Sequence, residues 1–429
     1  MPSTSLPAAS LAGVTLAALL AAIPARAQTP AQAAPQTATQ DVPKFVPKPA
    51  NCQNTSGPFD KWMAGLKQEA IKRGVRPQTL AIALTGLTED RSIINIDRGQ
   101  SFFSQSFLDF QAKLATNNRV TNGKQKMLQH AGTFQRAEEQ FGVPASIITA
   151  FWALESDFGS GMGKRPVMRS LATLAWDCRR GEMFREELLA ALQIIDRGDL
   201  VPSEMISSWA GELGQTQMLP TLYLKYAVDF DGDGKRNLFK SAPDIIGSTA
   251  NFIKSLGWQR GQPWLVEVRL PAKFPWEKAG LDVKQATATW AKQGITRVNG
   301  QPLAIDKLEA SLVLLQGRGG PAFLAYPNFQ IFPLWNQSLN YAVTAAYLAT
   351  RLDGAPLLNR GPSPAQPLPP ESIKDLQAQL NRIGAPVGEP DGKLGYATRS
   401  AIRQAQLAVG LPADGYPTLE LLDKVRAKK

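Results

Sequence analysis

One carboxylate in an apolar setting is better suited to acid–base chemistry than any other side chain of this sequence. Glu155 lies in residues 151–159, which read Phe-Trp-Ala-Leu-Glu-Ser-Asp-Phe-Gly. Pro144 suits a first helical turn, so the pattern predicts an apolar helix that stops at Gly159. Burial among aromatic rings and the negative end of a helix dipole both raise the pKa of a carboxyl, as a general acid requires. A surface glutamate at a helix end is the alternative.

A second group of side chains is suited to binding a polar ligand. Residues 208–220 read Ser-Trp-Ala-Gly-Glu-Leu-Gly-Gln-Thr-Gln-Met-Leu-Pro, and the small residues allow close backbone approach. Ser208, Gln215 and Gln217 offer hydrogen bonds that fit the hydroxyls and amides of a sugar. The alternative is a loop between helices whose amides satisfy their own backbone. Glu212 could be a second carboxylate, although a solvated loop position suits it better.

An acidic stretch resembles the start of a calcium-binding loop. It reads Asp-Phe-Asp-Gly-Asp-Gly-Lys-Arg-Asn and places Asp229, Asp231 and Asp233 at ligand positions one, three and five. Lys240 stands at position twelve, where a glutamate is expected, so the loop is incomplete. Asp244 could complete the shell if the chain folds back. We expect a structural Ca²⁺ here, and an acidic turn without metal is the alternative.

A fourth motif, Trp-Asn-Gln-Ser-Leu-Asn-Tyr-Ala, occupies residues 335–342. Asn336 or Ser338 could cap the helix that follows. Tyr341 could project its hydroxyl into a cleft or pack its ring in the core, and composition favours packing.

Composition limits the chemistry that is available. With 429 residues, 44% of them apolar, the chain can form a large core and more than one domain. His130 is the only histidine, which excludes any site that needs two. The net charge of +11 is spread along the chain, and it could favour an anionic polymer such as cell-wall glycan or nucleic acid. No zinc-finger, P-loop or RNA-binding motif is visible, so we expect no nucleic-acid partner.

The N-terminal region has the features of an export signal. Residues 11–23 are nearly all apolar, and Ala-Arg-Ala follows, ending at Ala27. We expect residues 1–27 to be a signal peptide cleaved near Ala27. The run is too short for a comfortable membrane span, and no cysteine near the cleavage site offers lipid attachment. A soluble periplasmic protein without a stable membrane anchor is expected.

Two cysteines would meet in an oxidising compartment. Cys52 and Cys178 could form one disulfide that fastens the mature N-terminus to the main domain. Two separate buried thiols are the alternative.

The remaining pattern divides the chain into segments. Residues 28–50 are rich in Ala, Gln, Thr and Pro and predict a disordered tether. Helical spacing dominates from Phe59 to about Leu256 and returns at residues 338–351. Strand candidates lie between these regions, at residues 265–270, 312–315 and 329–332. The proline-rich residues 358–370 predict a stiff, extended linker before a compact unit at residues 371–429.

Taken together, four motifs resemble the lytic murein transglycosylase B family. They are Glu-Ser-Asp-Phe-Gly, Ser-Trp-Ala-Gly-x-x-Gly-Gln-x-Gln-x-x-Pro, Tyr-Ala-Val-Asp-Phe-Asp-Gly-Asp-Gly and Asn-x-Ser-x-x-Tyr-Ala, in that order. The resemblance implies a mainly α fold, in which residues 51–357 form a lysozyme-like helical catalytic core with a small strand-containing portion. Such enzymes cleave the MurNAc–GlcNAc bond of peptidoglycan without water and leave a 1,6-anhydro-MurNAc end.

The resemblance also implies roles for particular residues. It makes Glu155 the acid/base and requires no cofactor for catalysis. It assigns calcium to the acidic loop, with Asp244 as an additional partner. At Glu212 the family usually has a small residue. The sugar-binding side chains that it implies are Ser208, Gln217, Asn336 and Tyr341.

The C-terminal unit resembles the peptidoglycan-binding type 1 domain. The matching stretches begin at Leu376 (Leu-Gln-Ala-Gln-Leu-Asn-Arg-Ile-Gly), Pro390 (Pro-Asp-Gly-Lys-Leu-Gly) and Gly410 (Gly-Leu-Pro-Ala-Asp-Gly). The resemblance implies a three-helix bundle, in which the Asp-Gly pairs form tight turns. It also implies peptidoglycan glycan strands as the partner, and we expect the protein to be a monomer.

One carboxyl is sufficient if the substrate supplies its own nucleophile. A glycosidase usually needs two carboxylates, but Asp157 should face away from Glu155 on the helix. Glu155 would protonate the glycosidic oxygen and then take the proton of the MurNAc C6 hydroxyl as that oxygen attacks C1. The alternatives are a lysozyme-type muramidase that uses water and a non-catalytic wall-binding scaffold.

Overall fold

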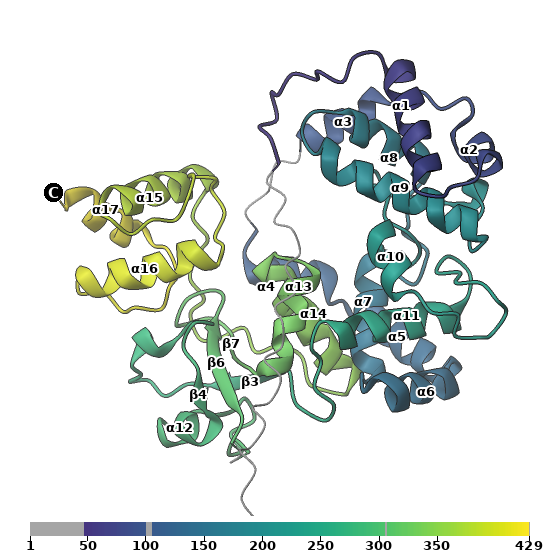
Figure 1. Ribbon diagram of the computed structural model, residues 1–429. Helices are drawn as coiled ribbons and strands as arrows, with labels where there is room; N and C mark the ends of the chain where they lie inside the picture. Colours follow the sequence, from purple (N-terminus) through teal and green to yellow (C-terminus); the bar gives the residue numbers. More distant parts are fainter. Residues whose placement is uncertain (1–46, 100–104, 305–306, 429) are drawn as a thin grey trace, which may run out of the picture. The chain divides into compact units, whose positions relative to one another are not determined.

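The computed structural model describes residues 47–99, 105–304 and 307–428 (Figure 1). The predicted signal peptide, residues 1–27, lies outside these residues, as does most of the predicted tether, residues 28–50. Within the described part of the chain, no helix is long and apolar enough to cross a membrane.

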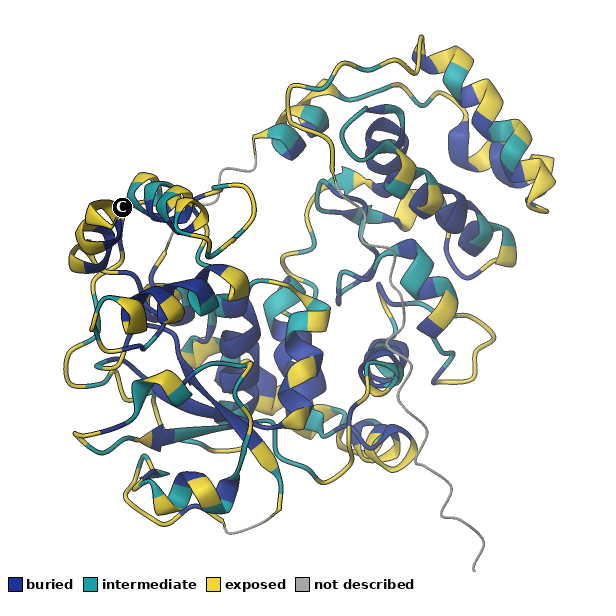
Figure 2. Ribbon diagram, turned by 60° about the vertical axis from the view of Figure 1, so that its left-hand side comes forward, coloured by how far each residue is buried: buried dark blue, intermediate teal, exposed yellow. Residues whose placement is uncertain are grey.

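The fold is mainly helical, as predicted. Buried residues lie on the sides where helices meet, and exposed residues lie on the opposite sides (Figure 2). The helices are α1 (Phe59–Lys72), α2 (Pro77–Leu84), α3 (Arg91–Arg98), α4 (Phe107–Leu114), α5 (Asn117–Gln129), α6 (Ala131–Phe141), α7 (Ala145–Ser156), α8 (Val167–Trp176), α9 (Gly181–Arg197), α10 (Pro220–Tyr226), α11 (Ala242–Ser255), α12 (Thr287–Lys292), α13 (Ile331–Trp335), α14 (Leu339–Leu352), α15 (Pro370–Arg382), α16 (Tyr396–Ala408) and α17 (Leu419–Ala427).

The strand-containing portion is an antiparallel sheet in the order β4-β6-β7-β3-β5. In its centre Val313 pairs with Phe323, and Val266 pairs with Leu324. Trp290 of α12 is fully buried in the core of this sheet. The strands are β1 (Arg165–Pro166), β2 (Ile206–Ser207), β3 (Leu265–Arg269), β4 (Gln285–Ala286), β5 (Thr296–Arg297), β6 (Glu309–Leu314) and β7 (Ala322–Ala325), of which β1 and β2 form a separate pair.

The strand prediction for residues 329–332 is wrong. These residues form the end of the 3₁₀ helix η3 (Pro327–Gln330) and the start of α13. A short apolar run fits a buried helix as well as a strand, and Pro327 suits a helix start. Phe329 and Phe332, three residues apart, are both fully buried, as expected for one helical face.

Helix α7 lies in the interior of the helical region, where it packs against α5, α6, α11 and α14. Every residue from Ser146 to Ala153 is buried, which is the pattern of a helix covered on all sides. Pro144 stands at the N-cap, one residue before the helix. The carboxyl end of this buried helix is therefore held in place by its neighbours.

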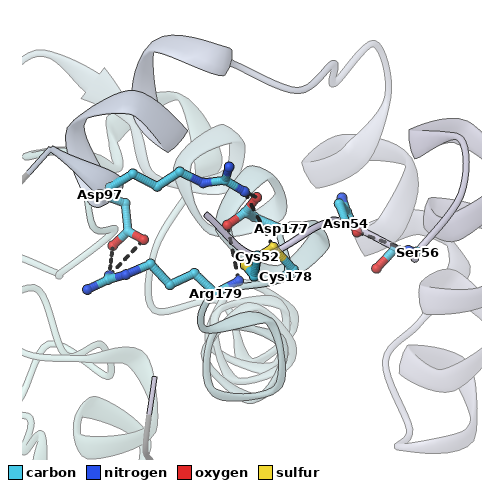
Figure 3. Close-up of a disulfide and its surroundings, with 8 residues drawn as sticks. Cys52, Asn54, Ser56, Asp97, Asp177, Cys178 and Arg179 are labelled. Atoms are coloured by element: carbon cyan, nitrogen blue, oxygen red, sulfur yellow. Dashed lines mark hydrogen bonds and ion pairs between the residues drawn. A yellow bond between two sulfur atoms is a disulfide. The ribbon is translucent and has the colours of Figure 1, made fainter. Parts of the chain in front are cut away.

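A disulfide joins Cys52 to Cys178 across a sequence separation of 126 residues (Figure 3). Ion pairs surround it. Asp97, which is almost fully buried, accepts hydrogen bonds from Arg179 at 2.9 Å and also pairs with Arg180. The disulfide attaches the segment before α1 to the loop between α8 and α9.

The C-terminal unit is the three-helix bundle that the sequence predicts. Its two Asp-Gly turns are built alike. Gln377 accepts a hydrogen bond from the N–H of Gly392 at 2.8 Å, and Gln406 accepts one from Gly415 at 2.9 Å. Both glycines have positive φ, of 75° and 71°, a conformation that glycine adopts without strain.

The proline-rich segment before this bundle is attached to the loop between β6 and β7. The N–H of Ser363 donates to the carbonyl of Gly319 at 3.0 Å, and the N–H of Ala365 donates to that of Gln316 at 3.1 Å. The Gln316 side chain accepts from the N–H of Leu108 at 3.2 Å and donates to the Ala365 carbonyl at 3.0 Å. The predicted stiff linker is thus also held along its length.

Candidate active site

Glu155 is the central carboxylate of the candidate site, and it lies in the last turn of α7. Two side chains from a distant part of the sequence donate hydrogen bonds to its Oε1 atom. The indole Nε1 of Trp335, at the end of α13, donates over 2.9 Å. The hydroxyl of Tyr341, in the first turn of α14, donates to the same oxygen. Both donors are neutral, so they support a carboxylate without pairing it with a cation.

Burial has the largest influence on the protonation of Glu155. It raises the pKa of the carboxyl, the hydrogen bonds from Tyr341 and Trp335 lower it, and the negative charge of Glu212 raises it further. Among the described residues, no lysine or arginine contributes to this shift. The side chain keeps partial exposure, so a ligand can reach it. A carboxyl that stays protonated toward neutral pH is suited to general acid catalysis.

The chain turns sharply just after Glu155. Helix α7 ends at Ser156 and not at the predicted Gly159, because Asp157 takes a φ of 47° as the C-cap. Positive φ is strained for a non-glycine residue, and such strain is concentrated at functional sites. The Asp157 carboxylate accepts from Arg119 at 2.8 Å, so it faces a partner of its own. The Asp157 carboxylate is thus engaged by Arg119.

Aromatic stacking positions the indole donor. The ring of Trp335 lies 4.1 Å from that of Phe151, with 21° between their planes, and 5.2 Å from that of Phe252. Phe151 stands four residues before Glu155, on the same face of α7. No role for Trp335 was predicted from the sequence. The one feature that could have indicated its role is the indole N–H, because a buried indole N–H needs an acceptor.

Gln215, predicted to bind substrate, braces the site from within. Its Oε1 accepts from the indole of Trp152 at 2.7 Å, and its Nε2 donates to the carbonyl of Phe239 at 2.8 Å. The hydroxyl of Ser156 donates to its backbone carbonyl at 2.5 Å. A Cβ at Gly159 would lie 2.7 Å from the Gln215 side chain. Both ends of the Gln215 amide are used inside the protein, which was the alternative that the sequence left open.

Gln217 and Ser208, the other two polar residues of this loop that were predicted to bind substrate, also form hydrogen bonds within it. Gln217 has a φ of 49°, and its Nε2 donates to the carbonyl of Gly214 at 2.8 Å. Ser208 donates from its hydroxyl to Glu212 Oε2 at 2.7 Å. The charge of Glu212 raises the pKa of Glu155, and Ser208 is bonded to Glu212.

The start of α14 combines capping with the site. Ser338 accepts a hydrogen bond from the N–H of Tyr341 at 3.4 Å and is the N-cap. Asn336, the other capping candidate, is exposed and accepts from the N–H of Ser338 at 3.0 Å. The Tyr341 ring is buried, which is the role that composition favours, and its hydroxyl donates to Glu155.

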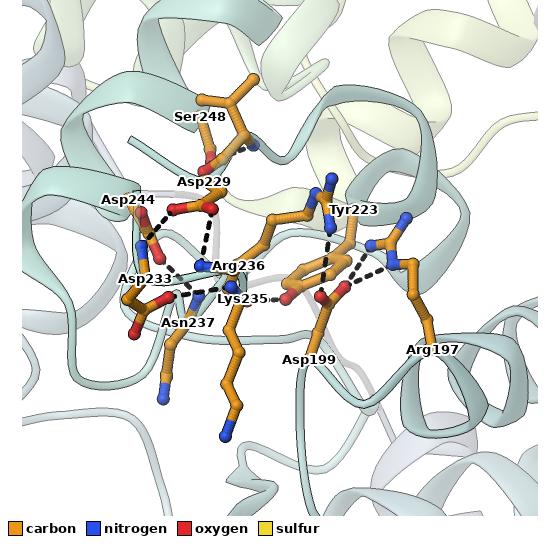
Figure 4. A network of polar contacts seen from close by, with 12 residues as sticks. Arg197, Asp199, Tyr223, Asp229, Asp233, Lys235, Arg236, Asn237, Asp244 and Ser248 are labelled. Atoms are coloured by element: carbon orange, nitrogen blue, oxygen red, sulfur yellow. Dashed lines mark hydrogen bonds and ion pairs between the residues drawn. The ribbon is translucent and has the colours of Figure 1, made fainter. Parts of the chain in front are cut away.

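Three carboxylates of the acidic region meet. Asp229, Asp231 and Asp244 bring oxygen atoms within 4.8 Å of one another. Asp244, fully buried in the first turn of α11, accepts from the N–H of Asn237 at 2.7 Å (Figure 4) and from the N–H of Phe230, also at 2.7 Å. Burial raises the pKa of Asp244, and the charges of Asp231 and Asp229 raise it further. A calcium ion would relieve this repulsion, and carboxylate oxygens are the ligands it prefers.

Asp233 lies outside this group. It is exposed, and its Oδ1 accepts from the N–H of Lys235 at 2.8 Å. Lys240, where a calcium loop would carry a glutamate, forms an ion pair with Glu204 at 2.5 Å. The carboxylates that could hold a cation are thus Asp229 and its two partners, without Asp233.

Two family models match the chain. One, described as a transglycosylase SLT domain, matches residues 58–350. The other, described as a peptidoglycan binding domain, matches residues 369–425.

Known proteins are also similar to this chain. The membrane-bound lytic murein transglycosylase B of Escherichia coli (strain K12) is 34% identical over 239 residues, which are 56% of this chain and 65% of that protein. The crystal structure of SltB3 from Pseudomonas aeruginosa in complex with NAG-anhNAM-pentapeptide has a TM-score of 0.81 and 40% identity, covering 86% of this chain and 100% of that one. The Escherichia coli lytic transglycosylase Slt35 in complex with calcium has a TM-score of 0.58 and 30% identity, covering 68% and 92%.

Proposed function

The chain belongs to the transglycosylase SLT domain family, and from this premise we propose that it is a periplasmic lytic transglycosylase of peptidoglycan. It would cleave the MurNAc–GlcNAc bond without water and leave a 1,6-anhydro-MurNAc end. The family match over residues 58–350 supports the reaction class. The similarity to SltB3, solved with NAG-anhNAM-pentapeptide, supports the substrate class.

Glu155 performs both proton transfers in the proposed reaction. In its protonated form it donates to the glycosidic oxygen as the bond from MurNAc C1 to that oxygen breaks. The resulting carboxylate then removes the proton of the MurNAc C6 hydroxyl while the C6 oxygen bonds to C1. The proton that Glu155 gives is thereby replaced, and no water is consumed. Because the nucleophile belongs to the same sugar, its attack has the advantage of an intramolecular reaction.

The neighbours of Glu155 match this double duty. Burial raises the pKa of the carboxyl, which favours the protonated form that the first step needs. The hydrogen bonds from Trp335 and Tyr341 stabilise the carboxylate that exists between the two steps, since bonds to charged acceptors are the stronger ones. The observation that carries the proposal is this one: a partly reachable carboxyl with two neutral donors and no cationic partner among the described residues.

Glu155→Gln tests the proposal. We expect a folded protein whose release of soluble muropeptides from purified sacculi falls by at least about 100-fold, as for loss of a general acid. Glu138→Gln, an exposed glutamate on α6, is the matched control and should keep wild-type activity. Full activity of Glu155→Gln would transfer the acid role to another residue.

Mass spectrometry of the products separates the alternatives. A lysozyme-type muramidase would give reducing ends heavier than anhydro ends by one water. A wall-binding scaffold would release no muropeptide at all. Only the anhydro product agrees with Glu155 as the single acid/base.

The C-terminal bundle supports a second part of the proposal, attachment to the wall. Residues 369–425 match a peptidoglycan binding domain. The full-length Glu155→Gln protein should co-sediment with sacculi, and deletion of residues 369–429 should weaken this binding. In solution, without sacculi, we expect the protein to be a monomer. The disulfide favours an oxidising compartment, so fractionation of cells should find the mature protein in the periplasm.

We also propose a structural Ca²⁺ held by Asp229, Asp231 and Asp244. The ion would join the loop after α10 to the start of α11. The proposal is supported by the meeting of the three carboxylates and by the similarity to Slt35, crystallised with calcium.

A further inference from the structure

Glu212 is a second carboxylate that the proposed reaction does not use. The sequence favours a solvated position for it, but the structure holds it half-buried. Within the described part of the chain, no basic side chain forms an ion pair with it. It accepts one hydrogen bond, from Ser208. Its charge raises the pKa of two other glutamates, Glu155 and Glu187. An unpaired carboxylate beside a catalytic acid suggests a function.

The backbone around Glu212 is fixed in place. Leu213 and Met218 exchange both backbone hydrogen bonds, at 2.7 and 3.0 Å. Gly211, directly before Glu212, has a φ of 79°, and a Cβ there would lie 2.5 Å from the side chain of Leu171. Gly214 has a φ of 69°, and its Cβ would lie 2.5 Å from Leu238. Close packing on both sides therefore determines where the Glu212 side chain starts.

The hydrogen bond to Glu212 decides what Ser208 can offer a ligand. A serine hydroxyl has one proton and two lone pairs. Because the Ser208 hydroxyl donates its hydrogen bond to Glu212 Oε2 at 2.7 Å, only its lone pairs are available to other partners. Ser208 then accepts hydrogen bonds, so it selects an O–H or an amide N–H of the sugar.

Few charged groups lie around Glu155. From α14 the hydroxyl of Tyr341 donates to it, and the charge of Glu212, in the loop after β2, raises its pKa. Arg119 of α5 acts on Tyr341 and is itself bound to Asp157. Glu212 is thus the one carboxylate, among the described residues, whose charge influences Glu155.

We propose that Glu212 is a positioning residue for the reaction proposed above. Through its hydrogen bond it orients Ser208 as an acceptor for the substrate, and through its charge it helps Glu155 to begin the reaction with a proton. The inference rests on the proposed function, because both roles serve substrate and acid of that reaction.

Two substitutions separate the two roles. Glu212→Gln removes the charge and leaves an oxygen that can accept from Ser208. The high-pH limb of kcat/KM should then move to lower pH by about half a unit to one unit, while KM changes less than about two-fold. Glu212→Asp keeps the charge but is too short to reach Ser208 in the same way. Its pH limb should stay in place, and KM should rise about ten-fold.

The assay measures anhydro products from soluble glycan fragments across pH. Glu138→Gln is the surface control, and thermal unfolding of each variant checks the fold. If Glu212→Gln keeps the wild-type pH limb, or Glu212→Asp keeps the wild-type KM, that role of Glu212 is refuted. If the wild-type protein itself makes no anhydro product, the proposed function fails instead, so the two failures are distinguishable.

Discussion

The hydrogen bond from Tyr341 to Glu155 allows a quantitative test of the electrostatics of the site. Tyr341→Phe removes only the hydroxyl that donates to Oε1 and keeps the buried ring. A hydrogen bond to a charged group contributes about 1.5–3 kcal/mol, and one between neutral groups about 0.5–1.5 kcal/mol. The carboxylate therefore loses about 1–1.5 kcal/mol more than the protonated form does. At 1.36 kcal/mol per unit, the pKa of Glu155 should rise by about one unit.

Two changes in the kinetics follow from that shift. The protonated acid persists to higher pH, so the high-pH limb of kcat/KM should move up by about one unit. The carboxylate formed after proton donation is less stable, so the plateau of kcat should fall by about ten-fold if that species limits the rate. The assay is the rate of anhydromuropeptide formation from a soluble glycan fragment, measured across pH by liquid chromatography and mass spectrometry.

Tyr347→Phe is the matched control for this experiment. Tyr347 lies on the same helix and is also buried, but its hydroxyl accepts from the N–H of Leu358 at 2.8 Å and has no bond to Glu155. Loss of this hydroxyl should leave the pH limb in place, so an equal shift in both variants would point to a general effect on α14. A limb of Tyr341→Phe that coincides with the wild type, or moves to lower pH, would refute the assigned role.

Three further predictions concern stability. Burial raises the pKa of Glu155, so the folded state holds a proton at pH values where the unfolded state has lost it. The contribution of this proton to the stability of the folded state is complete below the ordinary pKa of 4.5. It is lost as the pH rises through the pKa of the folded state. Glu155→Gln should therefore match the wild-type Tm in acid and exceed it at neutral pH, and a parallel pH dependence of both proteins would contradict this. Reduction of the disulfide, which spans 126 residues, should lower the free energy of unfolding in urea titrations by about 2–5 kcal/mol; an unchanged midpoint with reductant would show that it adds nothing. Calcium should raise the Tm of the wild type and not that of Asp244→Asn, whereas equal gains in both would place the ion elsewhere.

The sequence was informative where chemistry and local pattern coincide. Glu155 stands in an apolar helix whose composition alone predicts burial, and burial is the largest cause of its raised pKa. The mainly α fold, the sheet strands near residues 265 and 312 and the three-helix C-terminal bundle were also predicted. The strands follow from spacing within one segment, whereas the three-helix bundle is what the resemblance to the peptidoglycan-binding type 1 domain implies.

The sequence was less informative where function depends on long-range contacts. The donors to Glu155 stand 180 and 186 residues away along the chain, so no local pattern shows that Trp335 and Tyr341 share one acceptor. The amide of Gln215 suits a sugar as well as a protein partner, and only the fold shows that Trp152 takes it. Residues 329–332 lacked the length that separates a strand from a helix.

The pairing of Cys52 with Cys178 has a consequence for how the protein matures. The whole sequence contains two cysteines, so a single chain has one way to pair them and no wrong isomer to correct. An oxidase alone can complete this step, without a disulfide isomerase. Cys52 leaves the ribosome long before its partner, and until then its thiol can react only with other molecules. If the protein is exported as proposed, crowding of nascent chains would favour one kind of error, a covalent dimer between two of them.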